Sequence, residues 1–193
     1  MEKTFYDAAK EGKVEEVKDL LRKNPSLNVN WKNEEELGTK SALYVACNND
    51  RDSVVSILLA HPDIIPNLKN ADGWTPFITA CRNGHLACFS LLLQDQRVMV
   101  NEPDNDGATP LKLAAAYWGY HDVIKWWIVS GREMDLGTSG DSKTDAIGAA
   151  KQAKKTEVAT LLERFKSDPA KTRSEIRKEL GINGQYHLFF SID

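Results

Sequence analysis

The sequence has little cysteine, no long apolar run and no apolar leader, and each shortage excludes a class of protein. Its three cysteines are an odd number without zinc-type spacing, which argues against a secreted disulfide framework. The apolar runs are far shorter than a membrane span, and the first residues carry no signal core. We therefore expect a soluble protein of the cytoplasm, with the nucleus as an alternative, and no membrane partner.

An excess of charge of either sign is also lacking. The chain holds 25 Lys and Arg against 28 Asp and Glu, mixed along its length, for a formal net charge of −3. Binding to nucleic acid rests on a basic surface that neutralises phosphates, so we expect no nucleic-acid partner. Hydrophobic residues make up 41% of the 193 residues, enough to bury a core in one domain or in a linear array.

Catalytic constellations are missing as well. No Gly-rich phosphate loop, pair of catalytic carboxylates or metal-ligand spacing occurs, and the four histidines indicate no common site. Cys47, Cys81 and Cys88 fall in slots that suit small buried residues, so we interpret them as core residues rather than nucleophiles. We expect a protein that is not an enzyme and that holds no cofactor and no metal.

The sequence does contain a repeated segment. The segment at Thr75 reads Thr-Pro-Phe-Ile-Thr-Ala-Cys, and the segments at Ser41 and Thr109, each 34 residues away, read Ser-Ala-Leu-Tyr-Val-Ala-Cys and Thr-Pro-Leu-Lys-Leu-Ala-Ala. A weaker copy starts at Thr144, one residue late, and residues 5–9 begin a first copy. Each copy predicts a short helix capped by a hydroxyl, a Gly or Asn stop, and a longer apolar helix.

These phased features resemble the ankyrin repeat. The family pattern is Asp-Gly-x-Thr-Pro-Leu-His-x-Ala-Ala-x-x-Gly-His, followed by a leucine-rich helix and a Val-Asn hairpin, and residues 72–86 carry most of it. The histidine after Thr-Pro-Leu is replaced in every copy, so we expect packing to hold the first helices more than its hydrogen bond does. The resemblance implies an all-α fold: an ankyrin-repeat solenoid of stacked helix-turn-helix units with projecting β-hairpin loops.

The predicted array covers residues 1–169, in units of about 1–36, 37–70, 71–104, 105–139 and 140–169. Each unit is too small to fold alone, so stacking of neighbours stabilises the array. Residues 170–193 follow as a C-terminal helix, closed by Gly181, and an apolar tail. The sequence leaves open whether this tail folds back on the array, binds a partner or is disordered.

Small residues are expected between first helices and large ones between second helices. Trp126 and Trp127 stand where the preceding unit has leucines, and we predict that they fill space left by Ala146 and Gly148. The predicted small residues are Ala46, Ala80, Ala114 and Ala149, and the large ones are Leu58, Leu92, Trp127 and Leu161.

In the ankyrin family, partners usually bind the concave face, formed by hairpin tips and the exposed ends of first helices. The resemblance places contacts beside the Gly-x-Thr-Pro signature and after the alanine pair. Large aromatics and Arg among these residues are the most informative, because they dominate binding energy at interfaces. The predicted partner-binding residues are Lys40, Asn48, Asn49, Asp72, Trp74, Arg82, Asn83, Asp106, Ala108, Ala116, Tyr117, Trp118, Lys143, Lys151 and Gln152.

Trp74, Arg82, Tyr117 and Trp118 come from adjacent units and are expected to form one patch. Two alternatives to a binding role stay open for these tryptophans. The Trp118 side chain is buried in the array, since apolar side chains favour burial, or the Trp74 ring packs along its own hairpin.

The resemblance, together with the missing catalytic constellation, predicts a monomeric interaction or scaffold module that binds another protein. Two alternatives remain. Hairpin asparagines of ankyrin repeats are hydroxylated as a family trait, which the resemblance extends to Asn67 and Asn101, each with a leucine eight positions upstream. The second alternative is that the chain is a regulatory subunit whose C-terminal tail makes the functional contact.

Overall fold

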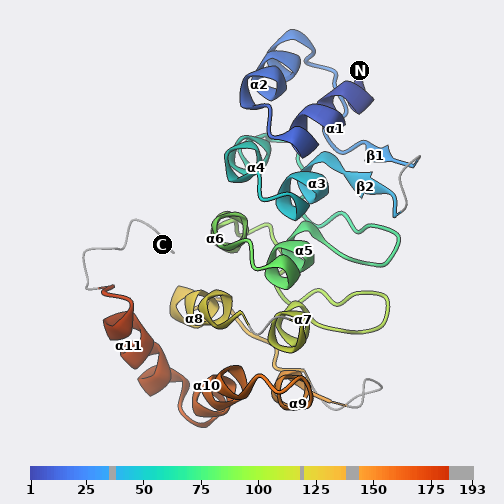
Figure 1. The fold of residues 1–193 in the computed structure, drawn as a ribbon. Coiled ribbons are helices and arrows are strands. Elements are labelled where there is room, and N and C mark those ends of the chain that lie inside the picture. The colour runs from blue at the N-terminus through green and yellow to red at the C-terminus, as the bar shows by residue number, and fades with distance from the viewer. Residues whose placement is uncertain (35–37, 118–119, 138–143, 183–193) are drawn as a thin grey trace.

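The chain forms a row of helix pairs whose connecting loops project on one side (Figure 1). The computed structural model describes residues 1–34, 38–117, 120–137 and 144–182. The elements in this part are α1 (Glu2–Glu11), α2 (Val14–Lys23), β1 (Lys32–Asn33), β2 (Lys40–Ser41), α3 (Ala42–Asn48), α4 (Asp52–Leu59), α5 (Pro76–Asn83), α6 (Leu86–Gln94), α7 (Pro110–Ala116), α8 (His121–Ser130), α9 (Ala146–Gln152), α10 (Thr156–Ser167) and α11 (Pro169–Glu179).

The helices are arranged in two layers along the row. The first helices α1, α3, α5, α7 and α9 pack in succession, and the second helices α2, α4, α6, α8 and α10 follow one another beside them (Figure 1). Strands β1 and β2 pair antiparallel, with Lys32 opposite Ser41. This architecture confirms the predicted all-α solenoid of helix-turn-helix units with projecting hairpins. The residue boundaries of the five units and the division near residue 169 remain predictions.

Local signals start and stop the first helices. The side-chain oxygens of Ser41, Thr75 and Thr109 each accept the backbone N–H three residues on, at 3.3, 3.1 and 3.3 Å. These bonds satisfy N–H groups that lack a partner within a helix. Gly84 ends α5 with φ of 69°, a left-handed conformation that glycine adopts without a steric penalty.

The first helix of the last pair starts one residue later than the sequence alignment predicts. The alignment puts Thr144 in the capping slot, but the Asp145 carboxylate accepts the backbone N–H three residues on at 2.7 Å, and α9 begins at the next residue. Asp is at least as good an N-cap as Thr, so Asp145 takes the slot. The small residue that corresponds to Ala114 is then Ala150, fully buried, and not Ala149.

Small side chains fill the contacts between first helices, as the sequence predicts. Ala46, Ala80 and Ala114 are fully buried, so adjacent helices approach closely. The predicted large side chains of the second layer are also buried: Leu58, Leu92, Trp127 and Leu161.

The predicted role of the two tryptophans is wrong. The Trp127 ring lies 5.1 Å from the ring of Phe77, edge to face, and 6.0 Å from that of Phe89, so it faces the preceding unit. The atoms nearest to a side chain added at Gly148 belong to Thr144 and its neighbour Asp145. Edge-to-face aromatic pairs are favourable, and α8 packs against α6 in the row, which explains the direction.

The predicted C-terminal helix is present as α11, and it packs against α8 and α10 (Figure 1). Its Ile176 is buried, and its Arg173 and Arg177 donate to the carbonyls of Ile128 and Val129 at 2.8 and 3.2 Å. Those carbonyls belong to the last turn of α8, where a helix has unpaired acceptors and favours cations. The helix α11 therefore supplies hydrogen-bond donors to the unpaired carbonyls at the end of α8.

Candidate functional site

A side-chain acceptor shapes the hairpin loop of the third unit. The Asn70 Oδ1 atom accepts the backbone N–H groups of Asp72 and Trp74 at 3.0 and 2.8 Å. Asn70 itself is buried, so its amide is held in place by the loop that it organises. Two of the predicted contact residues, Asp72 and Trp74, thus lie on a fixed turn.

The fourth unit repeats this arrangement with a carboxylate. The Asp104 Oδ1 atom accepts the backbone N–H groups of Asp106 and Ala108 at 3.0 and 2.8 Å. The backbone N–H of Asn105 donates to the Asp72 carbonyl at 3.2 Å, which joins the two loops. The predicted contact residues of both loops therefore share one continuous edge.

Arg82 lies between two aromatic rings. Its guanidinium carbon is 4.6 Å from the centre of the Trp74 ring and 5.0 Å from the centre of the Tyr117 ring. The Trp74 indole N–H donates to Asp104 Oδ2 at 3.3 Å, which fixes the first ring. A cation within about 6 Å of an aromatic face is attracted by its quadrupole. The structure thus brings together three of the four residues of the predicted patch, and Trp118 lies outside the described residues.

The Arg82 side chain is held mainly by these rings. Within the described part of the chain, its buried Nε–H has no hydrogen-bond partner. Tyr117, which follows α7, is half exposed, at 50%, and its ring lies against the guanidinium. The stack therefore presents an ordered cation and an exposed ring at the surface.

An aromatic cluster continues from the stack toward the N-terminus, and the sequence reasoning missed it. Trp74 and Trp31 pack against a cluster of Tyr6, Tyr44 and Val45. The Tyr6 and Trp31 rings meet edge to face at 6.1 Å. Burial raises the pKa of the Tyr44 hydroxyl, which therefore stays protonated. A signal was available, because Tyr44 occupies the slot of the family histidine.

Asn48 joins the ends of α3 and α5. Its Oδ1 accepts from the Thr79 hydroxyl at 3.3 Å and from the Asn83 amide at 3.4 Å, and its carbonyl lies 3.1 Å from His85 Nε2. The adjacent Asn49 donates to a carbonyl of its own helix at 2.7 Å. Asn48 and Asn83 thus lie side by side, whereas Asn49 closes α3.

The predicted contacts of the last unit lie apart from the stack. Lys151 pairs with Glu163 of α10 at 2.6 Å, and Gln152 is exposed at the end of α9. Because α9 starts one residue late, the pair that corresponds to Ala116 and Tyr117 is shifted by one, to Gln152 and the following alanine.

The remaining predicted contacts are spread along the hairpin edge. Lys40 lies in β2, paired with β1, and Ala116 is half buried at the end of α7. Lys143 lies outside the described residues, as Trp118 does. The geometry therefore concentrates the candidate site on the third and fourth units, around Arg82.

The asparagines that the family resemblance marks for modification tie neighbouring units together. The Asn67 amide donates to the Arg97 carbonyl at 2.7 Å and accepts the Met99 N–H at 2.8 Å. Asn101 makes the equivalent pair of bonds to the next unit, at 3.4 and 3.0 Å. Both ends of each amide are engaged, so these side chains have a structural role. Their hydroxylation stays a prediction.

We expect Asn67→Ala to lower the free energy of unfolding by about 0.5–1.5 kcal/mol, because the carbonyl and the N–H that lose their partner are exposed and can bond to water. Urea unfolding followed by circular dichroism measures this loss. Asn101→Ala is the matched control, with a smaller expected loss because its bonds are longer. A larger loss in the control would contradict the assignment of these bonds.

Two of the three cysteines are poor nucleophiles. Burial raises the pKa values of the Cys47 and Cys81 thiols well above their usual value, which disfavours the reactive thiolate. Cys88 is buried too, with its sulfur 3.6 Å from Asp50. The described residues contain no group of three or more His, Cys, Asp or Glu able to hold a metal ion. Across the same ranges, no helix has the length and apolar content to span a membrane.

One family model matches the chain. It is described as ankyrin repeats (3 copies), and it matches residues 5–101 and 62–138. These two matches together span the first four helix pairs, including the loops and first helices that hold the Arg82 stack. No curated protein matches the sequence.

Proposed function

Because this chain belongs to the ankyrin-repeat family, whose repeats generally mediate protein–protein interaction, we propose that it binds a partner protein through the face made by its hairpin loops and first helices. The centre of this face is the stack of Arg82 between Trp74 and Tyr117. The same face includes the hairpin residues Asp72 and Asp106 and the amides of Asn48 and Asn83.

The Arg82 stack is the observation that carries this proposal. An Arg side chain normally loses conformational freedom on binding, but the two rings already fix this one before a partner arrives. Arg and large aromatic residues are also the types that dominate binding energy. The guanidinium offers charge-assisted hydrogen bonds, so it would receive a carboxylate or a backbone carbonyl of the partner.

The test compares affinity capture by the full chain and by Arg82→Ala, followed by calorimetry with the captured protein. We expect Arg82→Ala to weaken binding by about 2 kcal/mol or more, a factor of about 30 in Kd. Arg82→Lys should lose much of the affinity as well, because an ammonium lacks the planar fork that stacks between two rings.

The control is Lys18→Ala, which removes an exposed cation on α2, far from the stack in the row. It should leave Kd unchanged. If Arg82→Ala keeps the helical circular dichroism of the parent and binds the partner with the same Kd, the stack is not the binding centre.

A further inference from the structure

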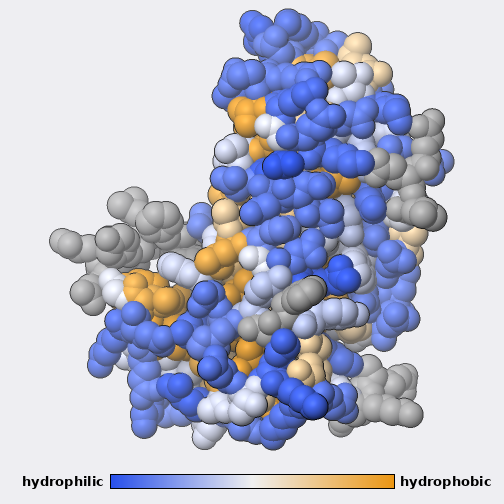
Figure 2. Space-filling view, viewed as in Figure 1, coloured by the Kyte–Doolittle hydropathy of each residue, from blue (hydrophilic) through white to orange (hydrophobic). Residues whose placement is uncertain are grey.

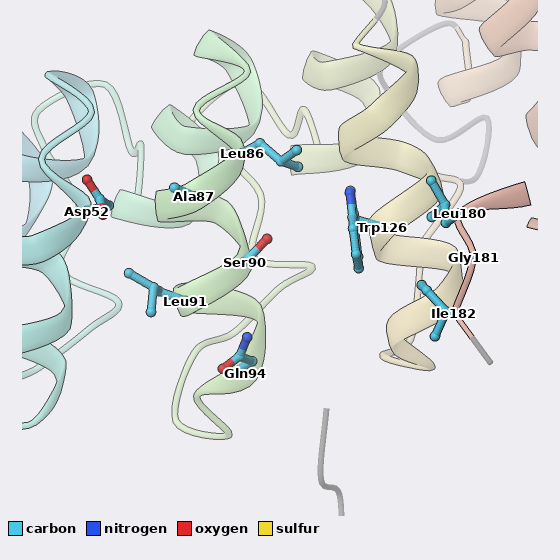
Figure 3. A pocket seen from close by; sticks show the side chains of 10 residues that line it. All are labelled: Asp52, Leu86, Ala87, Ser90, Leu91, Gln94, Trp126, Leu180, Gly181 and Ile182. Atoms are coloured by element: carbon cyan, nitrogen blue, oxygen red, sulfur yellow. The ribbon is translucent and has the colours of Figure 1, made fainter. Parts of the chain in front are cut away.

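An apolar groove opens on the opposite layer of the array, among the second helices. It has a volume of about 840 Å³ and lies between α6, α8 and the end of α11, with one residue from α4 (Figure 3). In the space-filling view, hydrophobic surface gathers on the side where α6, α8 and the end of α11 lie (Figure 2). The proposed binding face is made by other elements, so this groove is a separate feature.

The walls of the groove are made by residues far apart in the sequence. Leu86 and Leu91 come from α6, Trp126 comes from α8, and Leu180 and Ile182 come from the end of α11 (Figure 3). All five side chains are only partly buried. Among the described residues, the lining also includes Ala87, Ser90, Gln94 and Gly181, and a single charged residue, Asp52.

The chain itself leads into this groove. Helix α11 ends before Gly181, whose φ of 67° is a left-handed conformation that turns the backbone away from the helix axis. The next residue, Ile182, already lines the groove. Asn183-Gly184 follows, a dipeptide that favours a tight turn. In the sequence, Gln185 and then the largely apolar run 186–192 come after this dipeptide.

We propose that the chain's own segment 183–193 occupies this groove. Tyr186, Leu188, Phe190 and Ile192 alternate with other residues, so an extended segment would present all four side chains to one surface. Residues 183–192 contain no Lys, Arg, Asp or Glu, which matches a lining with one charged residue. The apolar run and the apolar groove bury each other.

The lengths and the connection favour this occupant over a separate molecule. Seven extended residues span about 23 Å, and the nine residues of α6 span about 14 Å, so the run can follow the whole helix. The linker from Ile182 to Tyr186 is short, which gives the segment an effective concentration on the order of millimolar at the groove. A free partner would have to exceed that concentration or bind more tightly.

The experiment uses the full chain and a tail variant, Tyr186→Ser/Leu188→Ser/Phe190→Ser, which removes three of the four apolar side chains of that face. A fluorescent peptide of residues 183–193 is titrated against both. We expect the peptide to bind the tail variant at least tenfold more tightly than the parent, because the parent groove is already filled. Amide hydrogen exchange in α6 should also be faster in the tail variant.

Three further variants separate the groove from other surfaces. Ala87 is exposed and lines the groove, so Ala87→Glu in the tail variant should fold and should weaken peptide binding at least tenfold. Ser56→Glu adds the same charge at an exposed position of α4 outside the lining and should change nothing. Gln185→Ser/His187→Ser alters the opposite side of the segment and should behave as the parent.

Several outcomes would overturn the proposal. Equal affinities of the peptide for the parent and for the tail variant reject it. Unchanged exchange in α6 rejects it too. A parent that is dimeric in light scattering, with a monomeric tail variant, assigns the groove to a second copy. A small apolar molecule retained by the parent in native mass spectrometry assigns the groove to that ligand. The face around Arg82 takes no part in these measurements.

Discussion

Replacing Trp127 with Ala is expected to lower the free energy of unfolding by about 3–5 kcal/mol. The Trp127 side chain is fully buried and is among the largest fully buried side chains in the described part of the molecule. Its ring contacts those of Phe77 and Phe89, and its indole N–H donates to the Glu133 carbonyl at 3.3 Å. Truncation leaves a cavity between the third and fourth units, and in a repeat array the contact between neighbours is what stabilises each unit.

Urea unfolding followed by far-ultraviolet circular dichroism measures this change without relying on the tryptophan signal. Trp126→Ala is the matched control on the same helix. Trp126 is only partly buried, so its loss should be about 1–2 kcal/mol. If the two variants lose the same stability, Trp127 does not hold the units together in the way described.

The second large effect is expected for Gly73→Ala. Gly73 has φ of 81°, and an added Cβ would lie 2.5 Å from the backbone nitrogen of Asn105 in the neighbouring loop. That loop cannot yield easily, because the same nitrogen donates to the Asp72 carbonyl. The left-handed conformation adds about 1–2 kcal/mol, and the overlap adds about 1–3 kcal/mol. We expect a total loss of about 2–5 kcal/mol.

The repeat supplies its own control for this prediction. Gly107 is the equivalent residue one unit later, with φ of 75°, and an added Cβ there meets no atom of the described residues within 4 Å. Gly107→Ala should therefore lose only the conformational part, about 1–2 kcal/mol. Chemical denaturation of both variants makes the comparison, and an equal loss would mean that the approach of Asn105 carries no energy.

Signals within a few residues of one another predicted most of the fold. The caps at Ser41, Thr75 and Thr109 are bonds between residues three positions apart, and the Gly84 stop is a property of one residue. The predicted start of the helix in the weak copy was wrong for an equally local reason, because Thr144 and Asp145 are adjacent and either can act as the N-cap. The sequence could have revealed that choice, since Asp is also a strong N-cap.

Hydrogen bonds between residues about 30 or more positions apart escaped the sequence reasoning. Arg132 donates to the carbonyls of Leu93, Asp95 and Val98 at 3.1, 3.2 and 2.6 Å, and so joins the fourth unit to the third. Nothing near Arg132 in the sequence marks those carbonyls as its partners. The same holds for Asn48, whose partners come from the following unit.

The candidate site was also only partly predictable from the sequence. The repeat phase predicted Trp74, Arg82 and Tyr117 as exposed positions, because each differs from what the scaffold requires; Tyr117 is exposed, whereas Trp74 and Arg82 are half-buried. Their direct stacking depends on how α5, α7 and the hairpin loop pack, and only the tertiary structure gives that.

By itself, the sequence determined that this protein is an all-α array, because caps, turns and apolar periodicity act over a few residues and recur in phase. The tertiary structure alone decided which side chains meet between units. It turned Trp127 toward Phe77, set Arg82 between two rings, and opened a groove between Leu86, Trp126 and Ile182. The physical reason is that such contacts depend on the distance between helices, which the packing of all units fixes together.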